Sequence, residues 1–267
     1  MADTTGPGDA RPTALQVICD EGLTGQLVDK SILLTGASAG ISVETAKALY
    51  TTGATLYLTA RNTDKAKQAL GADLAHPPPR APPQAGPTKI ATNYLGHFLL
   101  FLLLRPALLA GADKQYAEVV LDNINLDGEY ERWRACGQSN TAILWAANEI
   151  DRRIAPQGLR AFSVQPGGIQ TGLLQYMSED EKNVLASDPV LGPQFKSPEQ
   201  GAANSVWGAI SNLLEGMGGK YLEDVQIAKE YDASEGQWAP GYVPHAYSPE
   251  KKEELWKISL KLVGEDA

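Results

Sequence analysis

The sequence predicts an α/β fold built around a parallel sheet. Short apolar runs rich in β-forming residues alternate with helical patterns along the chain. The first run, Lys30–Thr35, is joined to a helical pattern by a turn of small residues, and a second run, Ala54–Thr59, follows directly after that helix. A strand, a glycine turn, a helix and a strand in this order form a βαβ unit, which implies parallel strands and a right-handed crossover.

Length and composition fit a single domain and exclude several classes of protein. The chain has 267 residues, 43% hydrophobic and 21% charged, with 23 basic and 32 acidic side chains and a net charge of −9. These values exclude a fibrous or wholly disordered chain, and the acidic balance argues against nucleic-acid and polybasic membrane partners. Two cysteines and three histidines are too few for a disulfide framework or a zinc site, so we expect no metal.

We expect neither a membrane span nor a secretory signal. The most apolar run, Phe98–Leu104, is far shorter than the roughly twenty residues that cross a bilayer. The N-terminus lacks the basic and apolar regions of a secretory signal, so the sequence predicts a cytoplasmic protein. The apolar run itself leaves two interpretations open: the surface of a homodimer, or a helix buried in the monomer.

The first part of the chain divides into an arm, a βαβ unit and a linker. We predict a flexible N-terminal arm over residues 1–24 and a domain over residues 25–267. After the second strand, a short helix is expected at Thr63–Leu70. Residues 71–88 are proline-rich, with six of the 17 prolines between Pro77 and Pro87. Such a segment forms neither an inner strand nor a helix, so we predict an exposed linker.

The second part continues the alternation of helices and strands. We expect, in order, a helix from Lys89 to about Leu109, a strand at Ala117–Leu121, a helix at Ser139–Arg153, a strand at Leu159–Val164, an edge strand at Gly219–Glu223 and a helix over residues 249–263. A lid-like loop over residues 224–249 carries Trp238, Tyr242 and Tyr247. These rings could cover an apolar ligand or simply pack over the core.

The turn between the first strand and the first helix is suited to a phosphate. Gly36 and Gly40 permit close approach of the backbone, and the first amides of the helix favour negative charge. A tight turn without a ligand would also explain them. Arg61 stands at the end of the second strand, with no carboxylate before Asp64. Because an arginine there suits the 2′-phosphate of NADP, the sequence predicts NADP(H), unless Arg61 is only a surface residue.

Four segments occur together in one order: Thr35–Ile41, an Asn93-x-x-Gly-His97 helix, the Gly-Gln-Ser-x-Thr-Ala pattern of Gly137–Ala142, and the Pro-Gly-Gly-Ile-x-Thr pattern of Pro166–Thr171. Together they resemble the short-chain dehydrogenase/reductases, especially the retinol-dehydrogenase-like branch and its fungal biosynthetic relatives. The resemblance covers about Leu27 to the C-terminus. It implies a single doubly wound parallel-sheet Rossmann domain, NADP(H) as cofactor, and a hydrophobic carbonyl or alcohol substrate in secondary metabolism.

The resemblance also implies roles for individual residues. Ser38, Gly40 and Ile41 would line the pyrophosphate, and the segment from Pro166 to Thr171 would contact the nicotinamide end. The full cofactor-binding set that it implies is Gly36, Ser38, Gly40, Ile41, Arg61, Asn93, Asn140, Pro166, Gly167, Ile169 and Thr171. The catalytic positions that it implies are Asn93, Cys136 and Asn140.

The catalytic positions depart from the family pattern. The family has a tyrosine where this chain has Cys136, and a lysine one helical turn later where it has Asn140. A cysteine could still donate a proton, since its unperturbed pKa is about 8.5, and Asn140 could bond a ribose hydroxyl. Residues 117–138 contain no serine or threonine to replace the family's catalytic serine. Tyr130, with Arg134 four residues later, is an alternative pair of a proton donor and a cation.

The architecture departs from the family as well. The family has two strands and a helix where this chain has only residues 62–88, so we predict that one or two strands are lacking there, one of them central. Buried backbone groups without partners cost about 1–3 kcal/mol each. Either the sheet is remodelled or the chain comes from a truncated or misspliced reading frame. Three hypotheses remain: an active oxidoreductase, a non-redox binding or cyclisation scaffold (a pseudoenzyme), and a non-functional product.

Overall fold

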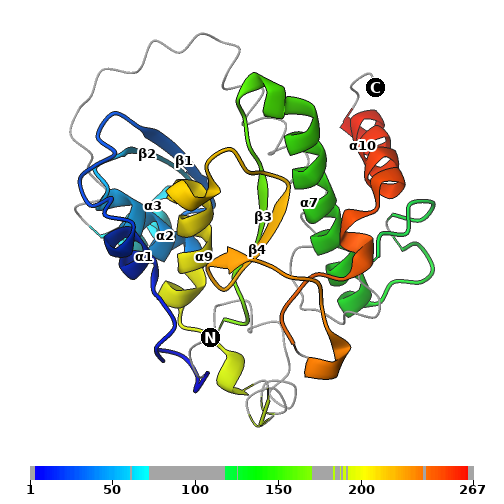
Figure 1. Ribbon diagram of the computed structural model, residues 1–267, viewed down its shortest axis with the longest axis horizontal. Helices are drawn as coiled ribbons and strands as arrows, with labels where there is room; N and C mark the ends of the chain where they lie inside the picture. The colour runs from blue at the N-terminus through cyan, green and yellow to red at the C-terminus, as the bar shows by residue number, and fades with distance from the viewer. Residues whose placement is uncertain are drawn as a thin grey trace. The chain divides into compact units, whose positions relative to one another are not determined.

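The computed structural model describes residues 4–60, 62–71, 118–124, 126–169, 183, 187, 189–190, 192–236 and 239–263 (Figure 1). The chain forms two compact units. The first unit comprises residues 1–78, 164–216 and 221–241, and the second comprises residues 79–163, 217–220 and 242–267. The helix predicted at Lys89–Leu109 and the linker after Gly71 lie outside the described residues, as do Phe98–Leu104 and Trp238.

The first unit contains the predicted βαβ unit. Strand β1 (Ser31–Thr35), helix α2 (Ile41–Tyr50) and strand β2 (Thr55–Thr59) follow one another, and helix α3 (Thr63–Leu70) comes next. The two strands are parallel and in register, with Leu33 opposite Tyr57. The predicted strands, helices and connection of this segment are therefore confirmed. The alternation arises because the short apolar runs of β1 and β2 favour strands, whereas α2 places Val43, Ala46 and Leu49 three residues apart on one buried helix face.

The two faces of the β1–β2 sheet differ in their surroundings. Leu34 and Leu58 point to one face and pack against Val43 and Ala46 of α2 and against Ala66 and Leu70 of α3. On the other face Leu33 is 47% exposed and Tyr57 is 40% exposed. Within the described residues β1 pairs with β2 alone. Residues 62–71 hold only α3, and the rest of the segment 62–88, where we predict that strands are lacking, lies outside the described residues.

The N-terminal segment differs from the predicted flexible arm. Helix α1 (Ala14–Asp20) begins at a Thr13 cap, buries Val17 and Ile18, and packs against α2 and against helix α9 (Pro198–Ile210). Before the helix, Arg11 pairs with Asp9 at 2.9 Å and donates to the carbonyls of residues 193–195. Burial raises the pKa of Asp9, but hydrogen bonds from Arg11 outweigh it and hold that pKa well below its usual range. These contacts order the segment.

A second sheet has the strand order β3-β4-β5, formed by β3 (Phe162–Gln165), β4 (Lys220–Glu223) and β5 (Gln226–Ile227). Strands β4 and β5 form an antiparallel hairpin in which Leu222 is opposite Ile227. The strands predicted at 159–164 and 219–223 are thus present. The prediction of β4 as an edge strand is wrong, because β5 pairs with its outer side. Two residues of β5 are too short a run for sequence patterns to show.

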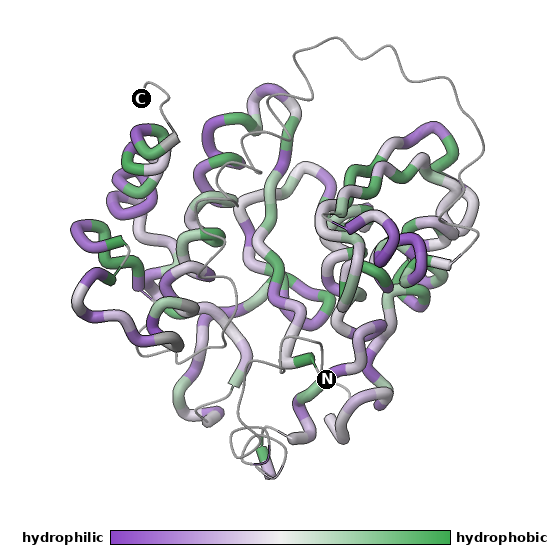
Figure 2. Tube along the Cα trace, turned by 180° about the vertical axis from the view of Figure 1, so that it is seen from behind, coloured by the Kyte–Doolittle hydropathy of each residue, from purple (hydrophilic) through white to green (hydrophobic). Residues whose placement is uncertain are grey.

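The second unit is organised around helix α7 (Arg132–Ile154), which contains the predicted helix and begins seven residues earlier. Helix α10 (Pro249–Val263) packs on it, and Trp256 contacts the cluster of Ala147, Ile150 and Ala161. Figure 2 shows hydrophilic and hydrophobic residues alternating around α10, as expected for a helix with one buried face. No helix in the described parts of the chain is long and apolar enough to span a membrane.

The strand predicted at Ala117–Leu121 is not formed by its described residues. Residues 118–124 make bends and turns instead. The amide of Val120 donates to Gln138 Oε1 of α7 at 2.9 Å, and Gln138 Nε2 donates to the carbonyl of Ile124 at 2.7 Å. The Gln138 side chain therefore pairs with backbone groups of this segment, a contact between distant residues that sequence patterns do not reveal.

An ion network centred on buried Glu149 joins α7 to α10. The carboxylate of Glu149 is 2% exposed and accepts hydrogen bonds from Arg152 at 2.6 Å and Arg153 at 3.0 Å, and both arginines also bond Glu253 at 2.7 Å. The guanidinium of Arg153 lies 4.8 Å from the ring centre of Trp256. Burial raises the pKa of Glu149, but the two arginines outweigh it and lower that pKa below its ordinary value of 4.5. The charged form is therefore the one that stabilises this unit.

We predict that Glu149→Gln lowers the free energy of unfolding by about 1–3 kcal/mol at pH 7, since it removes charged hydrogen bonds from a buried site. The folded-state pKa of Glu149 is depressed, so its contribution is present above the unfolded-state pKa and is lost as pH falls through the folded-state value. Urea denaturation at pH 7 and pH 4 should show a smaller loss of stability on acidification for Glu149→Gln than for the unaltered chain. Exposed Glu254→Gln is the control, and equal effects of both variants would contradict the prediction.

Candidate functional site

The glycine turn of the first unit has an open backbone. Gly36 has φ +76° and Gly40, which caps α2, has φ +64°, values that favour glycine. Gly36, Ala39 and Gly40 are exposed, and a Cβ at Gly36 would meet nothing within 4 Å. Buried Ala37 donates its amide to the carbonyl of Thr59 at 3.0 Å, which ties the turn to the end of β2. The turn therefore presents reachable amides at a helix N-terminus, the arrangement that suits an anion.

A second turn, Pro166–Ile169, follows β3 in the same unit. Gly167 has φ +93°, and its amide donates to Gln165 Oε1 at 3.2 Å. The carbonyl of Gly168 accepts from the amide of Lys196 at 2.8 Å, and Ile169 forms a parallel bridge with Lys196. The structure thus holds this turn from both ends. Thr171, predicted to follow in the same site, lies outside the described residues.

The two turns meet at Gly201 of α9. A Cβ at Gly201 would lie 2.1 Å from Ile169 Cδ1 and 3.0 Å from Ile41 Cγ2, so both side chains lie against the same glycine. Ile41 begins α2 directly after the first turn, and Ile169 ends the second. The structure therefore brings together two predicted cofactor residues that are far apart in the sequence. Sequence reasoning missed Gly201, although a glycine inside a helix is unfavourable by about 1 kcal/mol and therefore points to a close approach.

Asn204, one turn further along α9, was also missed. Its side chain is almost fully buried and makes three hydrogen bonds: Nδ2 donates to the carbonyls of Gln165 and Leu222 at 2.8 Å, and Oδ1 accepts from the amide of Val225 at 3.1 Å. Asn204 thereby ties the residue before Pro166 to the β4–β5 hairpin. An asparagine in a helix pattern carries no signal of such partners.

The predicted catalytic positions lie in the second unit. Cys136 and Asn140 both belong to α7, one turn apart, as the resemblance implies for the two positions, and Asn140 is exposed. Tyr130 precedes α7 and is 69% exposed, whereas Arg134 lies within α7 and pairs with Glu129 at 3.0 Å. Tyr130 and Arg134 therefore do not share a helix face, and the alternative pair is not supported. Asn93 and Arg61 lie outside the described residues.

The aromatic residues predicted in the lid-like loop pack locally. The rings of Tyr242 and Tyr247 lie edge to face, 4.7 Å between centroids, and Lys252 Nζ is 5.8 Å from the Tyr247 ring. Trp145 Nε1 of α7 donates to the carbonyl of His245 at 2.9 Å. Burial lowers the pKa of His245, against the opposing effect of Glu118. In the second unit this segment therefore forms part of the packed structure around α7.

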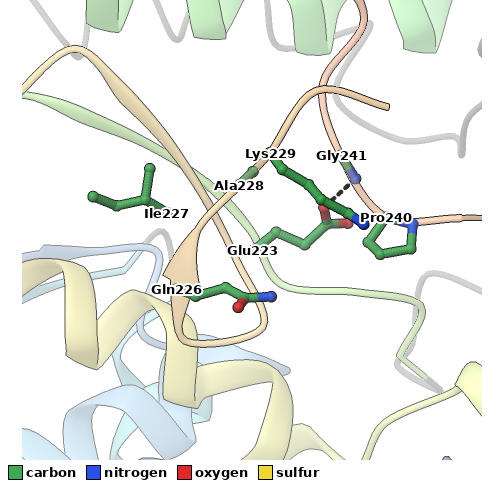
Figure 3. Close-up of a pocket in the computed structure, with 7 residues that line it drawn as sticks. All are labelled: Glu223, Gln226, Ile227, Ala228, Lys229, Pro240 and Gly241. Carbon is green, nitrogen blue, oxygen red and sulfur yellow. Dashed lines mark hydrogen bonds between the residues drawn. The ribbon is translucent and has the colours of Figure 1, made fainter. Parts of the chain in front are cut away.

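A small pocket lies elsewhere in the first unit, beside the β4–β5 hairpin (Figure 3). Its volume is about 120 Å³, and the carboxylate of Glu223 accepts from the amide of Gly241 at 2.7 Å within it. It contains none of the predicted site residues and is far smaller than the roughly 300–1,000 Å³ of ligand pockets. Among the described residues no group of His, Cys, Asp and Glu could hold a metal ion. The two turns that meet at Gly201 are therefore the candidate site.

Curated proteins similar to this chain come from fungi, bacteria and mammals. The short-chain dehydrogenase/reductase prx1 of Penicillium roqueforti is 36% identical over 318 residues, covering 98% of this chain and 93% of the relative. The oxidoreductase calI of Penicillium decumbens is 32% identical over 328 residues, covering 97% of this chain and 94% of the relative. No protein-family model matches the chain.

Among solved structures, an uncharacterized protein from Mycobacterium paratuberculosis shares the fold, with a TM-score of 0.52, 22% identity, and coverage of 89% of this chain and 94% of that one. The sequence comparison with prx1 also shows how many aligned positions have no residue in this chain. Since 98% of this chain is about 262 residues, an alignment of 318 leaves about 56 positions without a residue here. That length is enough for two strands and a helix with their connections.

We predict that Gly201→Ala destabilises the chain by about 1–3 kcal/mol, because the new methyl group overlaps Ile169 and crowds Ile41. Replacing Ile169 by valine removes the overlapping Cδ1 atom, so the double variant Gly201→Ala with Ile169→Val should recover part of the loss. Urea denaturation of the two single variants and the double variant measures this coupling. Additive effects would mean that the two residues are not in contact, contrary to the structure.

Proposed function

The chain belongs to the short-chain dehydrogenase/reductase family, and we propose that it is an NADP(H)-dependent oxidoreductase acting on a hydrophobic carbonyl or alcohol. The observation that carries the proposal is the meeting at Gly201 of the Gly36–Gly40 turn and the Pro166–Ile169 turn. The family resemblance assigns the first turn to the pyrophosphate and the second to the nicotinamide end. Both lie in one unit, so their arrangement is fixed by the contacts described above.

The residues present fit the phosphate part of such a cofactor. At Gly36 the backbone is open where a side chain would stand, and the helix that follows begins without a side-chain cap. The amide of Ser38 donates to the carbonyl of Gly36 at 2.8 Å, so the amides of Ala39 to Ile41 are the ones that would bond the pyrophosphate, and the helix dipole would favour its charge. The bulk of Ile41 and Ile169 would exclude water from the cofactor's neighbourhood.

Arg61 supports the choice of NADP(H). It follows the last residues of β2, where a carboxylate would accept the ribose hydroxyls of NAD, and no carboxylate occurs before Asp64. A guanidinium at this place would form charge-assisted hydrogen bonds with a 2′-phosphate. The proposed preference for NADP(H) over NAD(H) therefore depends on a single residue, Arg61.

The cofactor would supply a hydride, and the chain would have to supply the proton. We assign the proton to the Cys136 thiol, which takes the position of the family's tyrosine, and a ribose contact to the Asn140 amide. Asn140 stands where the family has a lysine, so no ammonium at that position would assist the proton transfer, and we expect slow turnover limited by this step.

The proposed substrate class and setting come from relatives. The polyprenol dehydrogenase of Mus musculus is 31% identical over 70% of this chain and 56% of that protein. Its name specifies a long apolar alcohol, which supports a hydrophobic substrate here. The fungal relatives and the resemblance to fungal biosynthetic reductases support a place in secondary metabolism. We also propose a cytoplasmic location and a homodimer as the working form.

A second candidate function follows from Cys136 and Asn140 themselves. The cofactor turns are retained while the family's proton donor and its cation are both replaced, which favours a non-redox protein that uses the fold as a binding or cyclisation scaffold. The two candidates differ in whether the unaltered chain oxidises NADPH at all. A third possibility, a non-functional product, requires that the chain not unfold cooperatively.

We predict that the purified chain binds NADPH saturably and more tightly than NADH. Ala39→Asp should abolish binding, because the exposed carboxylate would repel the pyrophosphate while leaving the helix N-terminus stable. Ala39→Ser is the matched control and should bind normally. Fluorescence titration with melting curves measures both. If Ala39→Asp bound NADPH as tightly as the unaltered chain does, the glycine turn would not be the phosphate site.

We predict that Arg61→Ala raises the NADPH dissociation constant at least tenfold and leaves that of NADH unchanged, since only NADPH carries the 2′-phosphate. Parallel titrations with both cofactors give the ratio. Loss of both affinities in equal measure would contradict the assignment of Arg61 to the 2′-phosphate.

We predict that Cys136→Tyr combined with Asn140→Lys increases NADPH-dependent carbonyl reduction by at least tenfold, because the phenol would then be tuned by an ammonium on the same helix face. Steady-state oxidation of NADPH over a panel of hydrophobic ketones and aldehydes measures it. No oxidation by the unaltered chain together with activity of the double variant would favour the non-redox scaffold over the enzyme.

A further inference from the structure

Lys196 is a buried cation that none of the family motifs above includes. Its side chain is 7% exposed, and it forms an ion pair with Asp224, whose side chain is 37% exposed. Lysine is rarely buried without a reason, because removing its ammonium from water is costly. The pair lies within the first unit, between the segment that precedes α9 and the β4–β5 hairpin.

The lysine side chain crosses the Pro166–Ile169 turn. A Cβ at Gly167 would lie 3.0 Å from Lys196 Cδ and Cε and 3.2 Å from Nζ, so the aliphatic part of the lysine covers this glycine. The backbone of Lys196 also holds the turn, through its amide bond to Gly168 and its bridge with Ile169. One residue therefore restrains the turn with both its backbone and its side chain.

The partner of Lys196 stands in a strained hairpin. Asp224 has φ +51° and Val225 has φ +58°, a left-handed conformation that a β-branched residue rarely adopts. The amide of Val225 is held by Asn204 Oδ1, and the same asparagine donates to the carbonyl of Gln165. The hairpin and the turn are thus joined twice, by the Lys196–Asp224 pair and by Asn204. A strained conformation persists only where such contacts over-determine it.

We propose that Lys196, through its ion pair with Asp224, is a positioning residue that holds the Pro166–Ile169 turn in the shape that receives the nicotinamide end of the cofactor. This inference rests on the proposed cofactor site. The ammonium acts on the turn and not on the cofactor, because its charge is already matched by Asp224. Removing the charge of Lys196 or that of Asp224 should therefore loosen the Pro166–Ile169 turn in the same way.

The test is a double-mutant cycle in NADPH affinity with Lys196→Gln, Asp224→Asn and the double variant. Asparagine tolerates the left-handed conformation, so Asp224→Asn preserves the hairpin. We expect each single variant to raise the NADPH dissociation constant about five- to twentyfold, with the double variant no weaker than the singles. Lys229→Met, which removes an exposed ion pair with Glu235 at 2.8 Å in the same unit, is the control and should change nothing.

A direct role of the lysine charge would give another pattern. If Lys196→Gln weakened NADPH binding while Asp224→Asn left it unchanged or tightened it, the ammonium would act on the cofactor itself and the proposal would be overturned. Lower melting temperatures with unchanged NADPH affinity would show a role in stability only, and would overturn it equally. The fluorescence of bound NADPH adds a spectroscopic signature, since its emission at saturation should approach that of free NADPH in both single variants.

Hydrogen exchange in the cofactor-free protein separates this inference from the proposed function. The amide of Gly167, which donates to Gln165 Oε1, and the amide of Lys196, which donates to the carbonyl of Gly168, should exchange at least tenfold faster in Lys196→Gln and in Asp224→Asn than in the unaltered chain or in Lys229→Met. This result would support the positioning role even if the chain bound no NADPH, which would refute only the proposed cofactor. Unchanged exchange of these two amides would overturn the positioning role whatever the cofactor affinity.

Discussion

The close approach of α9 to two turns is the constraint on which the first unit depends. Gly201 has no side chain, so Ile41 and Ile169 can both occupy the space beside it. One turn further along, Asn204 satisfies three backbone groups that would otherwise be buried without partners. Each unpaired group would cost about 1–3 kcal/mol, a large share of the roughly 5–15 kcal/mol that stabilises a whole domain. A glycine and an asparagine thus decide where the two turns lie.

The parts of the fold that depend on local sequence could be predicted. The βαβ unit and helices α3, α7 and α10 follow from apolar periodicity and from glycines that end helices, because these features act over a few residues. The middle position of β4 and the absence of a strand at residues 118–121 could not be predicted. The first depends on pairing with the two-residue strand β5, and the second on a bond between Val120 and Gln138. Both are contacts between separate segments.

The candidate site likewise has parts that the sequence predicts and parts that it does not. Its glycine turns were evident from residue type and spacing, because a positive φ strongly favours glycine. Gly201, Asn204 and Lys196 were missed, since each acts through the turn that it supports. Leu33 and Tyr57 lie on the face of the β1–β2 sheet opposite to Leu34 and Leu58, and both are at least 40% exposed.

The replacements at Cys136 and Asn140 are chemically related. An unperturbed tyrosine has a pKa near 10 and needs a neighbouring cation to release its proton at neutral pH, whereas a thiol near 8.5 needs less help. Losing the lysine therefore harms a cysteine less than it would harm a tyrosine, and restoring the tyrosine alone would leave a weaker acid than the thiol. Asparagine keeps hydrogen-bonding capacity at the vacated position without placing a charge there. The cofactor turns impose their own requirement, glycines at Gly36 and Gly167, and the chain keeps both. In the proposed function the glycine turns would hold the cofactor and Cys136 would supply the proton, so cofactor binding would persist where proton transfer is weakened.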